Sequence, residues 1–427
     1  ARNHMRAVDP TQQDVAGTAM QLSRAWAGGL VSVELHLGKA VGPPVDLTLE
    51  LQDQRPAMKD KYEILNQSVG QGSFGIVRRA RHKSSDTACV VKAVKKASAG
   101  DQYRANLVDA GLGETLLRMS SEQPHDNIAR YFDMLEGPTH FYVVMEELQG
   151  PELLQYIEDV FPITEAFVHD IVKQILESLA HLHGVIGLVH RDVKLANFRF
   201  RGPVDSSPLV LLDFGLASSA SRPWDGAVCG TTMFMSPELV AHLVKAPQMK
   251  AMDIWAVGVI LFVLLTGDSP FEDADIKAWG QPDTALQQAS ELVERVLARD
   301  ELRVASECAL ALLRKLLVAE PTERLSAEAA LRHSWFSTAP ASGQERKLPV
   351  TREGYRKVRT ASRTSEIRKP VLRTASGGLL AATARRRAPP LRAASSPDLG
   401  SEALLSPVGW ELPDSGGLHR IVSAGSA

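Results

Sequence analysis

Cysteine is scarce in this sequence of 427 residues, and the three present lie far apart, at Cys89, Cys229 and Cys308. They form neither a C-x-x-C pair nor the even-numbered framework of a disulfide-rich secreted scaffold. A reducing compartment is therefore favoured over secretion. We expect an intracellular, cytoplasmic protein and leave a nuclear location open.

Long apolar runs are missing as well. The longest uncharged apolar stretch, Ile254 to Gly267, is shorter than the roughly 18 residues of a membrane span, so we predict a buried core helix and no transmembrane segment. The first thirty residues carry several charges without a long apolar run, which argues against a signal peptide. No D-x-[DN]-x-[DN]-G loop occurs, which argues against calcium binding through such a loop.

An excess of one charge sign is also absent over the whole chain. The formal net charge of -2 gives no reason to expect a nucleic acid as partner. Hydrophobic residues at 44% and charged residues at 23% are typical of a globular protein and exclude wholesale disorder, collagen and coiled coil. The charge is uneven, however, because 15 Lys and Arg face 7 Asp and Glu from Ala341 onward. An acidic body thus carries a basic tail.

Apolar periodicity divides the body into two parts. Short β-type runs dominate from Tyr62 to Met145, and long helical periods follow beyond Glu152. This order favours an α+β protein of two lobes. Ahead of it, residues 1–61 contain two alternating runs, Val31 to Leu37 and Val45 to Leu51, which could form a hairpin.

The tail, residues 337–427, is rich in Arg, Ser, Pro, Ala and Gly and has few large apolar groups. Such a segment buries too little surface to offset its ordering entropy, so we expect it to be disordered. One small repeat occurs in it. Arg359-Thr-Ala-Ser362 recurs as Arg373-Thr-Ala-Ser376, and Arg392-Ala-Ala-Ser395 is closely related.

A glycine-rich run lies between two strand-like runs rather than before a helix, which favours a β-hairpin folded over phosphates. Glycine allows backbone amides to approach phosphate oxygens. A purely structural glycine turn is an equal alternative from this spacing alone. The residues of the run that we assign to nucleotide binding are Val69, Gly70, Gly72, Ser73, Phe74, Gly75 and Val77.

Lys92 stands inside an apolar strand-like run, where an unpaired ammonium is costly to bury. It therefore needs an anionic partner. Glu114, in the amphipathic stretch Leu107 to Met119, is the natural one. The alternative is a lysine that reaches solvent from a strand edge.

The most informative runs are Val189 to Phe200 and Leu211 to Gly215. Phosphoryl transfer needs a carboxylate that takes the hydroxyl proton, an ammonium for the γ-phosphate, and amide and carboxylate oxygens for magnesium. Each residue alone could be a helix cap or a turn residue, but their joint order and spacing favour this chemistry. The four residues are Asp192, Lys194, Asn197 and Asp213.

With these motifs the chain resembles the eukaryotic-type serine/threonine protein kinases from about Tyr62 to Phe336. Further matches are Ser236-Pro237-Glu238, which is similar to the end of the family's activation segment, and the run Asp253 to Gly258. Arg324 matches the arginine that in the family pairs with the glutamate of that segment. The calmodulin- and calcium-dependent group is the most similar. The resemblance implies a two-lobed kinase fold, with a small β-rich N-lobe that has one main helix and a larger, mainly helical C-lobe.

The resemblance also implies residue roles, with ATP and Mg as cofactors. Asp192 would be the catalytic base, Lys194 the phosphate-contacting lysine, and Asn197 and Asp213 the magnesium ligands. Lys92, oriented by Glu114, would hold the α- and β-phosphates. The Glu146 carbonyl and the Leu148 amide would meet the adenine edge, beside Met145 as gatekeeper, and Glu152 would face an arginine three residues before the phosphoacceptor. We therefore expect a monomer that phosphorylates basic Ser/Thr segments of protein substrates.

Some positions depart from the family pattern. Val90 replaces an alanine above the adenine and Arg199 a leucine below it, so a non-catalytic pseudokinase scaffold that presents the basic tail is the alternative function. Arg118 occupies an apolar position of the family helix. Ala227 stands where relatives carry a phosphothreonine, so either Asp225 gives Arg191 a fixed negative charge, which we favour, or a nearby serine is phosphorylated.

The tail itself could bind in cis. Its Arg-x-x-Ser sequences at Ser362, Ser376 and Ser395 match the expected substrate pattern, and Arg385 to Pro390 could act as a pseudosubstrate. The alternative is a basic tail unrelated to catalysis.

Overall fold

A computed structural model describes residues 21–27, 30–36, 48–49, 58–72, 75–99, 101–337, 347–348, 350–364, 366–371 and 419–420. The chain separates into two units, Ala1–Ala57 and Met58–Ala427. The first unit contains an antiparallel sheet of β1 (Gln21–Ala27), β2 (Leu30–His36) and β3 (Thr48–Leu49). The two predicted alternating runs overlap β2 and β3, which do pair, whereas β1 was not predicted.

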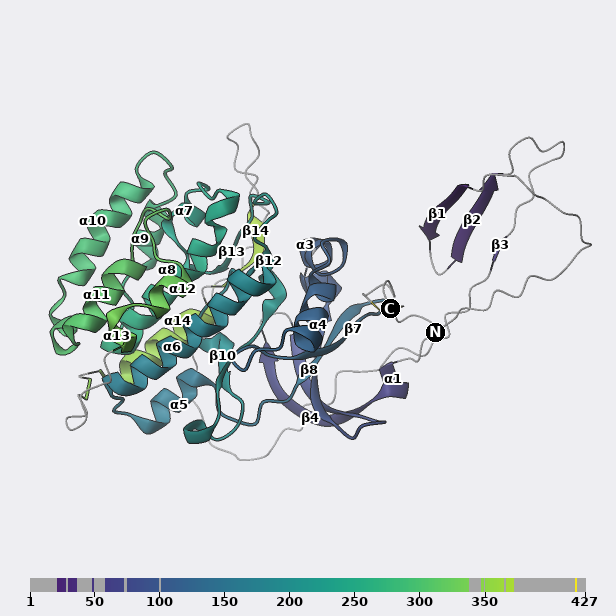
Figure 1. The fold of residues 1–427 in the computed structure, drawn as a ribbon, viewed down its shortest axis with the longest axis horizontal. Coiled ribbons are helices and arrows are strands. Elements are labelled where there is room, and N and C mark those ends of the chain that lie inside the picture. Colours follow the sequence, from purple (N-terminus) through teal and green to yellow (C-terminus); the bar gives the residue numbers. More distant parts are fainter. Residues whose placement is uncertain are drawn as a thin grey trace, which may run out of the picture. The chain divides into compact units, whose positions relative to one another are not determined.

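The N-lobe of the second unit is built on an antiparallel sheet in the order β15-β7-β8-β6-β5-β4. Strands β4, β7 and β8 of this sheet are labelled in Figure 1. Its central strand β6 is buried from Cys89 to Val94, as its apolar sequence requires, and this burial carries Lys92 into the lobe. The strands are β4 (Tyr62–Gly72), β5 (Gly75–His82), β6 (Ala88–Lys95), β7 (Tyr131–Glu136), β8 (His140–Glu146) and β15 (His419–Arg420).

Short helices accompany this sheet and lead to the main N-lobe helix, α4. Gly111 adopts a left-handed conformation, with φ of 71°, immediately before α4 and so separates it from the preceding turns. The helical segments of the lobe are α1 (Met58–Lys61), α2 (Lys96–Ala99), α3 (Asp101–Arg104), the π-turn Ala105–Asp109 and α4 (Leu112–Glu122).

The C-lobe packs around α8 (Met249–Thr266), which is apolar on all sides. By length and composition this helix could cross a membrane, but 83% of its apolar window is buried inside the lobe. The predicted buried core helix is therefore confirmed. The surrounding helices are α5 (Leu153–Val160), α6 (Glu165–His181), α7 (Pro237–Val240), α9 (Asp273–Ala278), α10 (Ala285–Leu297), α11 (Glu307–Leu316), α12 (Ala327–Leu331) and α13 (Ser334–Ser337).

Local sequence sets where these helices begin. The Thr164 hydroxyl accepts a hydrogen bond from the Phe167 amide at 3.2 Å and so caps α6, with Glu165 in the first turn. Ser306 and Ser326 cap α11 and α12 in the same way. The three cysteines are free thiols, which agrees with the absence of a disulfide framework.

Short strands and 3-10 turns of the C-lobe flank the loops that carry the candidate site residues. The strands form three two-stranded sheets, β10-β11, β12-β9 and β13-β14. The elements are β9 (Leu188–Val189), β10 (Phe198–Phe200), β11 (Leu209–Leu211), β12 (Ser218–Ser219), β13 (Val228–Thr231) and β14 (Glu366–Val371), with 3-10 turns at Leu195–Asn197, Val204–Ser206, Phe214–Leu216, Thr232–Phe234, Ala246–Gln248 and Asp300–Val304.

The expectation of disorder from residue 337 onward was wrong for part of the tail. Helix α14 (Arg352–Thr364) lies against α5 of the C-lobe (Figure 1). Tyr355 is fully buried and its hydroxyl donates to the Leu264 carbonyl at 3.0 Å, and Val358 is buried one turn later. These two apolar residues lie on one face of an otherwise charged helix, as expected for a helix that packs on a core. Ser376, Ser395 and Arg385 to Pro390 lie outside the described residues.

Candidate active site

A cleft between the sheet and the C-lobe collects most of the predicted site residues. Ser73 and Phe74 lie outside the described residues. Gly70 and Gly72 lie in β4, where their backbones pair with Val77 and Gly75 of β5. The predicted residues that line the cleft are Val69, Gly75, Val77, Lys92, Glu146, Leu148, Glu152, Lys194, Asn197 and Asp213.

Gly75 is fixed by a close approach of two strands. A Cβ atom added there would lie 1.8 Å from the carbonyl oxygen of Ala93, an impossible contact. Gly75 pairs with Val94 of β6, so a side chain would push β5 away from the strand that carries Lys92. Gly75 therefore allows β5 and β6 to lie close together at the edge of the cleft.

Lys92 and Asp213 form the charged pair at the back of the cleft. The Lys92 ammonium lies 2.7 Å from Asp213 Oδ1. Burial alone would raise the pKa of the Asp213 carboxyl, but the charges of Lys92 and Lys194 outweigh it and hold this pKa below its ordinary value. Asp213 is therefore an ionised oxygen donor at neutral pH, as a magnesium ligand must be.

The predicted pairing of Lys92 with Glu114 was wrong in this structure. Glu114 is exposed in the first turn of α4, where a carboxylate is favourable beside the helix N-terminus. Because α4 begins only after Gly111, its inward face is formed by Leu112, Leu116 and Met119. Leu116 lines the cleft together with Tyr103, a residue that the sequence analysis did not single out.

The exposed position of Glu114 leads to a prediction that tests whether this residue acts together with Lys92. Because Glu114 is exposed, Glu114→Ala should change kcat/KM for ATP by no more than about twofold. Lys92→Ala removes a charged hydrogen-bond donor from the cleft and should cost about 10- to 100-fold. Steady-state phosphorylation of a basic peptide over a range of ATP concentrations measures both. An equal loss in the two variants would mean that Glu114 acts with Lys92 during catalysis.

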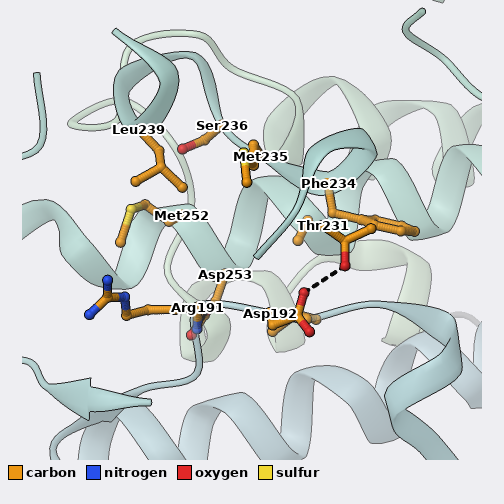
Figure 2. A pocket seen from close by; sticks show the side chains of 11 residues that line it. Arg191, Asp192, Thr231, Phe234, Met235, Ser236, Leu239, Met252 and Asp253 are labelled. Carbon is orange, nitrogen blue, oxygen red and sulfur yellow. Dashed lines mark hydrogen bonds between the residues drawn. The ribbon is translucent and has the colours of Figure 1, made fainter. Parts of the chain in front are cut away.

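Asp192 is the centre of a buried hydrogen-bonded cluster. Its Oδ1 accepts from the Thr231 hydroxyl at 2.9 Å, and its Oδ2 lies 2.9 Å from the Lys194 ammonium. Figure 2 shows the Thr231 hydroxyl facing the Asp192 carboxylate. Lys194 also donates to Thr231 at 2.8 Å, and Asn197 Nδ2 donates to the Asp192 carbonyl at 2.7 Å. The structure thus brings together the carboxylate, ammonium and amide that were predicted for phosphoryl transfer.

Asp253 holds the backbone of this loop in place. From the buried helix α8 its carboxylate accepts from the amides of His190 at 2.8 Å and Arg191 at 2.9 Å, and from His183 Nε2 at 2.8 Å. Burial opposes its charge, but these bonds dominate and lower the pKa of Asp253. Arg191 adopts a positive φ of 69°, a costly conformation that this anchoring maintains immediately before Asp192. The supporting role of His183 was not predicted, because nothing in its local sequence reveals a contact 70 residues away.

Arg191 contacts the part of the chain from Asp225 to Cys229, which precedes Ser236-Pro237-Glu238 in the region similar to the family's activation segment. Its guanidinium donates to Asp225 Oδ2 at 3.3 Å, to the Ala227 carbonyl at 3.3 Å and to Cys229 Sγ at 2.9 Å. Asp225 thus occupies the position that was predicted for a fixed negative charge. The buried guanidinium has an anionic partner without any phosphate on the segment.

A second buried ion pair anchors the end of this segment. Arg324 donates to Glu238 Oε1 at 2.8 Å and Oε2 at 3.1 Å, with the two side chains 0% and 1% exposed. The pairing predicted for Arg324 is therefore confirmed. Glu238 belongs to α7, which follows Thr231 by a few residues along the chain. The ion pair therefore holds the end of the activation segment on the C-lobe.

The part of the cleft that is predicted to hold adenine contains the two departures from the family pattern. Val90 and Arg199 both line the cleft. Arg199 Nε donates to the Leu148 carbonyl at 3.2 Å, which holds the guanidinium beside the segment that joins β8 to the C-lobe. Arg199 therefore adds a charged group to the lining of this part of the cleft.

Comparison with known proteins agrees with this geometry. The family described as "Protein kinase domain" matches residues 63–336. The chain is 32% identical to the calcium/calmodulin-dependent protein kinase type 1B of Rattus norvegicus over 291 residues, 68% of this chain and 79% of the relative. It is 29% identical to the serine/threonine-protein kinase H1 of Homo sapiens over 296 residues, 69% of this chain and 65% of the relative. The chain belongs to the protein kinase family.

This kinase is a serine/threonine protein kinase related to the calmodulin-dependent group, with the predicted two-lobed fold. Its family uses ATP and typically magnesium. The donor set fits that use, because Asn197 donates to Asp192 through its amide nitrogen, so its amide oxygen could serve as a hard ligand in the cleft that the ionised Asp213 also lines. Lys92 and Lys194 line the same cleft, and their ammonium groups would face the phosphates of a bound nucleotide.

Proposed function

We propose that this kinase transfers the γ-phosphoryl group of MgATP to Ser or Thr in basic segments of protein substrates. The observation that supports the reaction is the cluster of Asp192, Lys194 and Thr231, which lies beside a cleft that holds Lys92 and Asp213. A carboxylate beside an ammonium can accept the hydroxyl proton while the ammonium balances charge on the transferred group.

The remaining roles are those that the family resemblance implies for residues of the cleft. Asn197 and Asp213 would hold magnesium, and Lys92 would contact the α- and β-phosphates. Glu146, the last residue of β8, and Leu148, two residues later, would bind the adenine edge. The monomeric state and the cytoplasmic location stay predictions.

The proposed substrate preference concerns the residue three positions before the phosphoacceptor. Glu152, at the N-cap of α5, is an acidic residue that lines the same cleft. Acidic side chains on α5 and three Arg-x-x-Ser-like sequences in the tail support a preference for arginine three residues before the acceptor.

A positional peptide library tests the preference. With the full-length kinase and MgATP, we expect arginine at the third position before the acceptor to raise kcat/KM by about 10- to 100-fold over alanine, the value of one charge-assisted contact. Lysine should be weaker because it lacks the planar fork. A flat profile at that position would contradict the preference, and lack of phosphate transfer to every peptide would favour the pseudokinase scaffold instead.

A further inference from the structure

The stretch from Ser218 to Asp225 of the activation segment contains one large apolar residue, Trp224. Its side chain is half-buried and packs on an apolar cluster formed by residues of β9, β13, α7 and α8. The Trp224 ring also lies 5.6 Å from the ring of His242, which follows α7. Trp224 therefore attaches this stretch to the C-lobe. Buried members of the cluster are Val189, Val228, Leu239, Met249 and Met252.

Apolar packing, rather than a hydrogen bond, holds the indole ring of Trp224. Its Nε1 atom is buried and has no hydrogen-bond partner among the described residues. A buried donor without a partner costs free energy, so the ring stays in place because its apolar surface is removed from water. A phenyl ring at this position should therefore keep most of the contact.

The next residue, Asp225, carries the charge that faces Arg191. Its Oδ1 accepts from the Ala227 amide at 3.0 Å, and its Oδ2 accepts from Arg191 Nη1 at 3.3 Å. The second contact, from Arg191 Nη2 to Asp225 Oδ1, is 3.5 Å long, and the Asp225 side chain is 30% exposed. Long and partly exposed ion pairs contribute little free energy. The charge contact alone is therefore a weak anchor for the segment.

We propose that Trp224 is a positioning residue for phosphoryl transfer, because its ring holds the activation segment on the C-lobe and so keeps Asp225 on Arg191. This inference rests on the proposed function. Arg191 directly precedes Asp192, and the Asp192 carboxylate accepts from Thr231 of the same segment. A displaced segment would therefore disturb the catalytic carboxylate from two sides. The apolar anchor takes the place of a negatively charged modification of the segment.

The Cys229 thiol reports the position of the segment without any phosphate transfer. Cys229 is 3% exposed, and its Sγ accepts from Arg191 Nη2 at 2.9 Å. Burial raises the pKa of the Cys229 thiol, and a buried thiol reacts slowly with alkylating reagents. Release of the segment would expose this thiol and increase its rate of alkylation.

Alkylation of the full-length kinase with iodoacetamide, followed by peptide mapping of Cys229, tests the proposal. Trp224→Ala should raise the labelling rate of Cys229 about tenfold and lower kcat about tenfold, with KM for ATP nearly unchanged. Trp224→Phe should restore both values. Asp225→Asn keeps the ring and removes the charge, so it should raise labelling by no more than about threefold. Arg222→Ala, at an exposed position of the same segment, is the matched control and should leave labelling and kcat unchanged.

The variants distinguish the ring from the charge as the anchor. Labelling of Cys229 at the wild-type rate in Trp224→Ala would overturn the inference, and so would an equal release by Asp225→Asn. Faster labelling of the buried Cys89 together with Cys229 would assign Trp224 to the stability of the whole kinase instead, and would also overturn it. Because alkylation needs no phosphate transfer, a kinase without activity on peptides would contradict the proposed function and leave the labelling result standing.

Discussion

Asp192→Asn should lower kcat for peptide phosphorylation by about 10²- to 10⁴-fold, the range lost when a general base is removed. Asparagine has nearly the same size and can still accept the Thr231 hydroxyl, which lies 2.9 Å from Oδ1 in the wild type. It cannot take the proton of the attacking hydroxyl. It also removes the negative charge beside the Lys194 ammonium, at 2.9 Å from Oδ2. The loss should therefore fall on the chemical step and leave nucleotide affinity nearly unchanged.

Single-turnover phosphate transfer and the Kd for MgATP, measured on the same preparation, separate these effects. Asp300→Asn, on an exposed side chain of the C-lobe, is the matched control and should behave like the wild type. A variant that keeps most of its kcat would show that the proton leaves by another route. A variant that loses nucleotide affinity instead would show that Asp192 organises the metal-binding side of the cleft.

The clustering of the proposed catalytic residues could be predicted because they stand close together in the sequence. Asp192, Lys194 and Asn197 lie within one short loop and meet in the structure, and the family resemblance supplied the role proposed for each. The pairing of Arg324 with Glu238 spans 86 residues, yet the family resemblance predicted it correctly. The fixed charge at Asp225 was also found, because it is the acid nearest to the position where relatives carry a phosphate.

The failures share a different cause. Glu114 was predicted as the partner of Lys92 from its place in an amphipathic stretch, but the left-handed Gly111 starts α4 in a register that turns Glu114 to solvent. The tail helix was missed because only Tyr355 and Val358 give it an apolar face, within a charged and serine-rich segment. The docking of the tail helix depends on contacts between distant parts of the chain, which local composition does not report. The register of α4 depends on one backbone conformation at Gly111, which the apolar pattern alone does not predict.

Arg324→Ala should lower the free energy of unfolding more than any other substitution predicted in this article. Its guanidinium donates to both oxygens of Glu238 and also to the carbonyls of Ala251 at 2.6 Å and Val318 at 2.9 Å. Alanine would leave the Glu238 carboxylate, 1% exposed, as an unpaired buried charge. Breaking a buried pair in this way costs about 3–5 kcal/mol, whereas loss of an exposed pair costs about 0–1 kcal/mol.

Urea unfolding of Arg324→Ala beside Arg303→Ala measures this difference, because Arg303 pairs with Asp300 while both side chains are more than three quarters exposed, at 78% and 77%. The double change Arg324→Met with Glu238→Leu should recover much of the stability, since it leaves no buried charge. It should not recover kcat, because Glu238 ties α7 and the preceding Thr231 region to the C-lobe, and Thr231 contacts Asp192. Full recovery of both stability and kcat would mean that the pair is only a packing element, and that the position of Thr231 is set elsewhere.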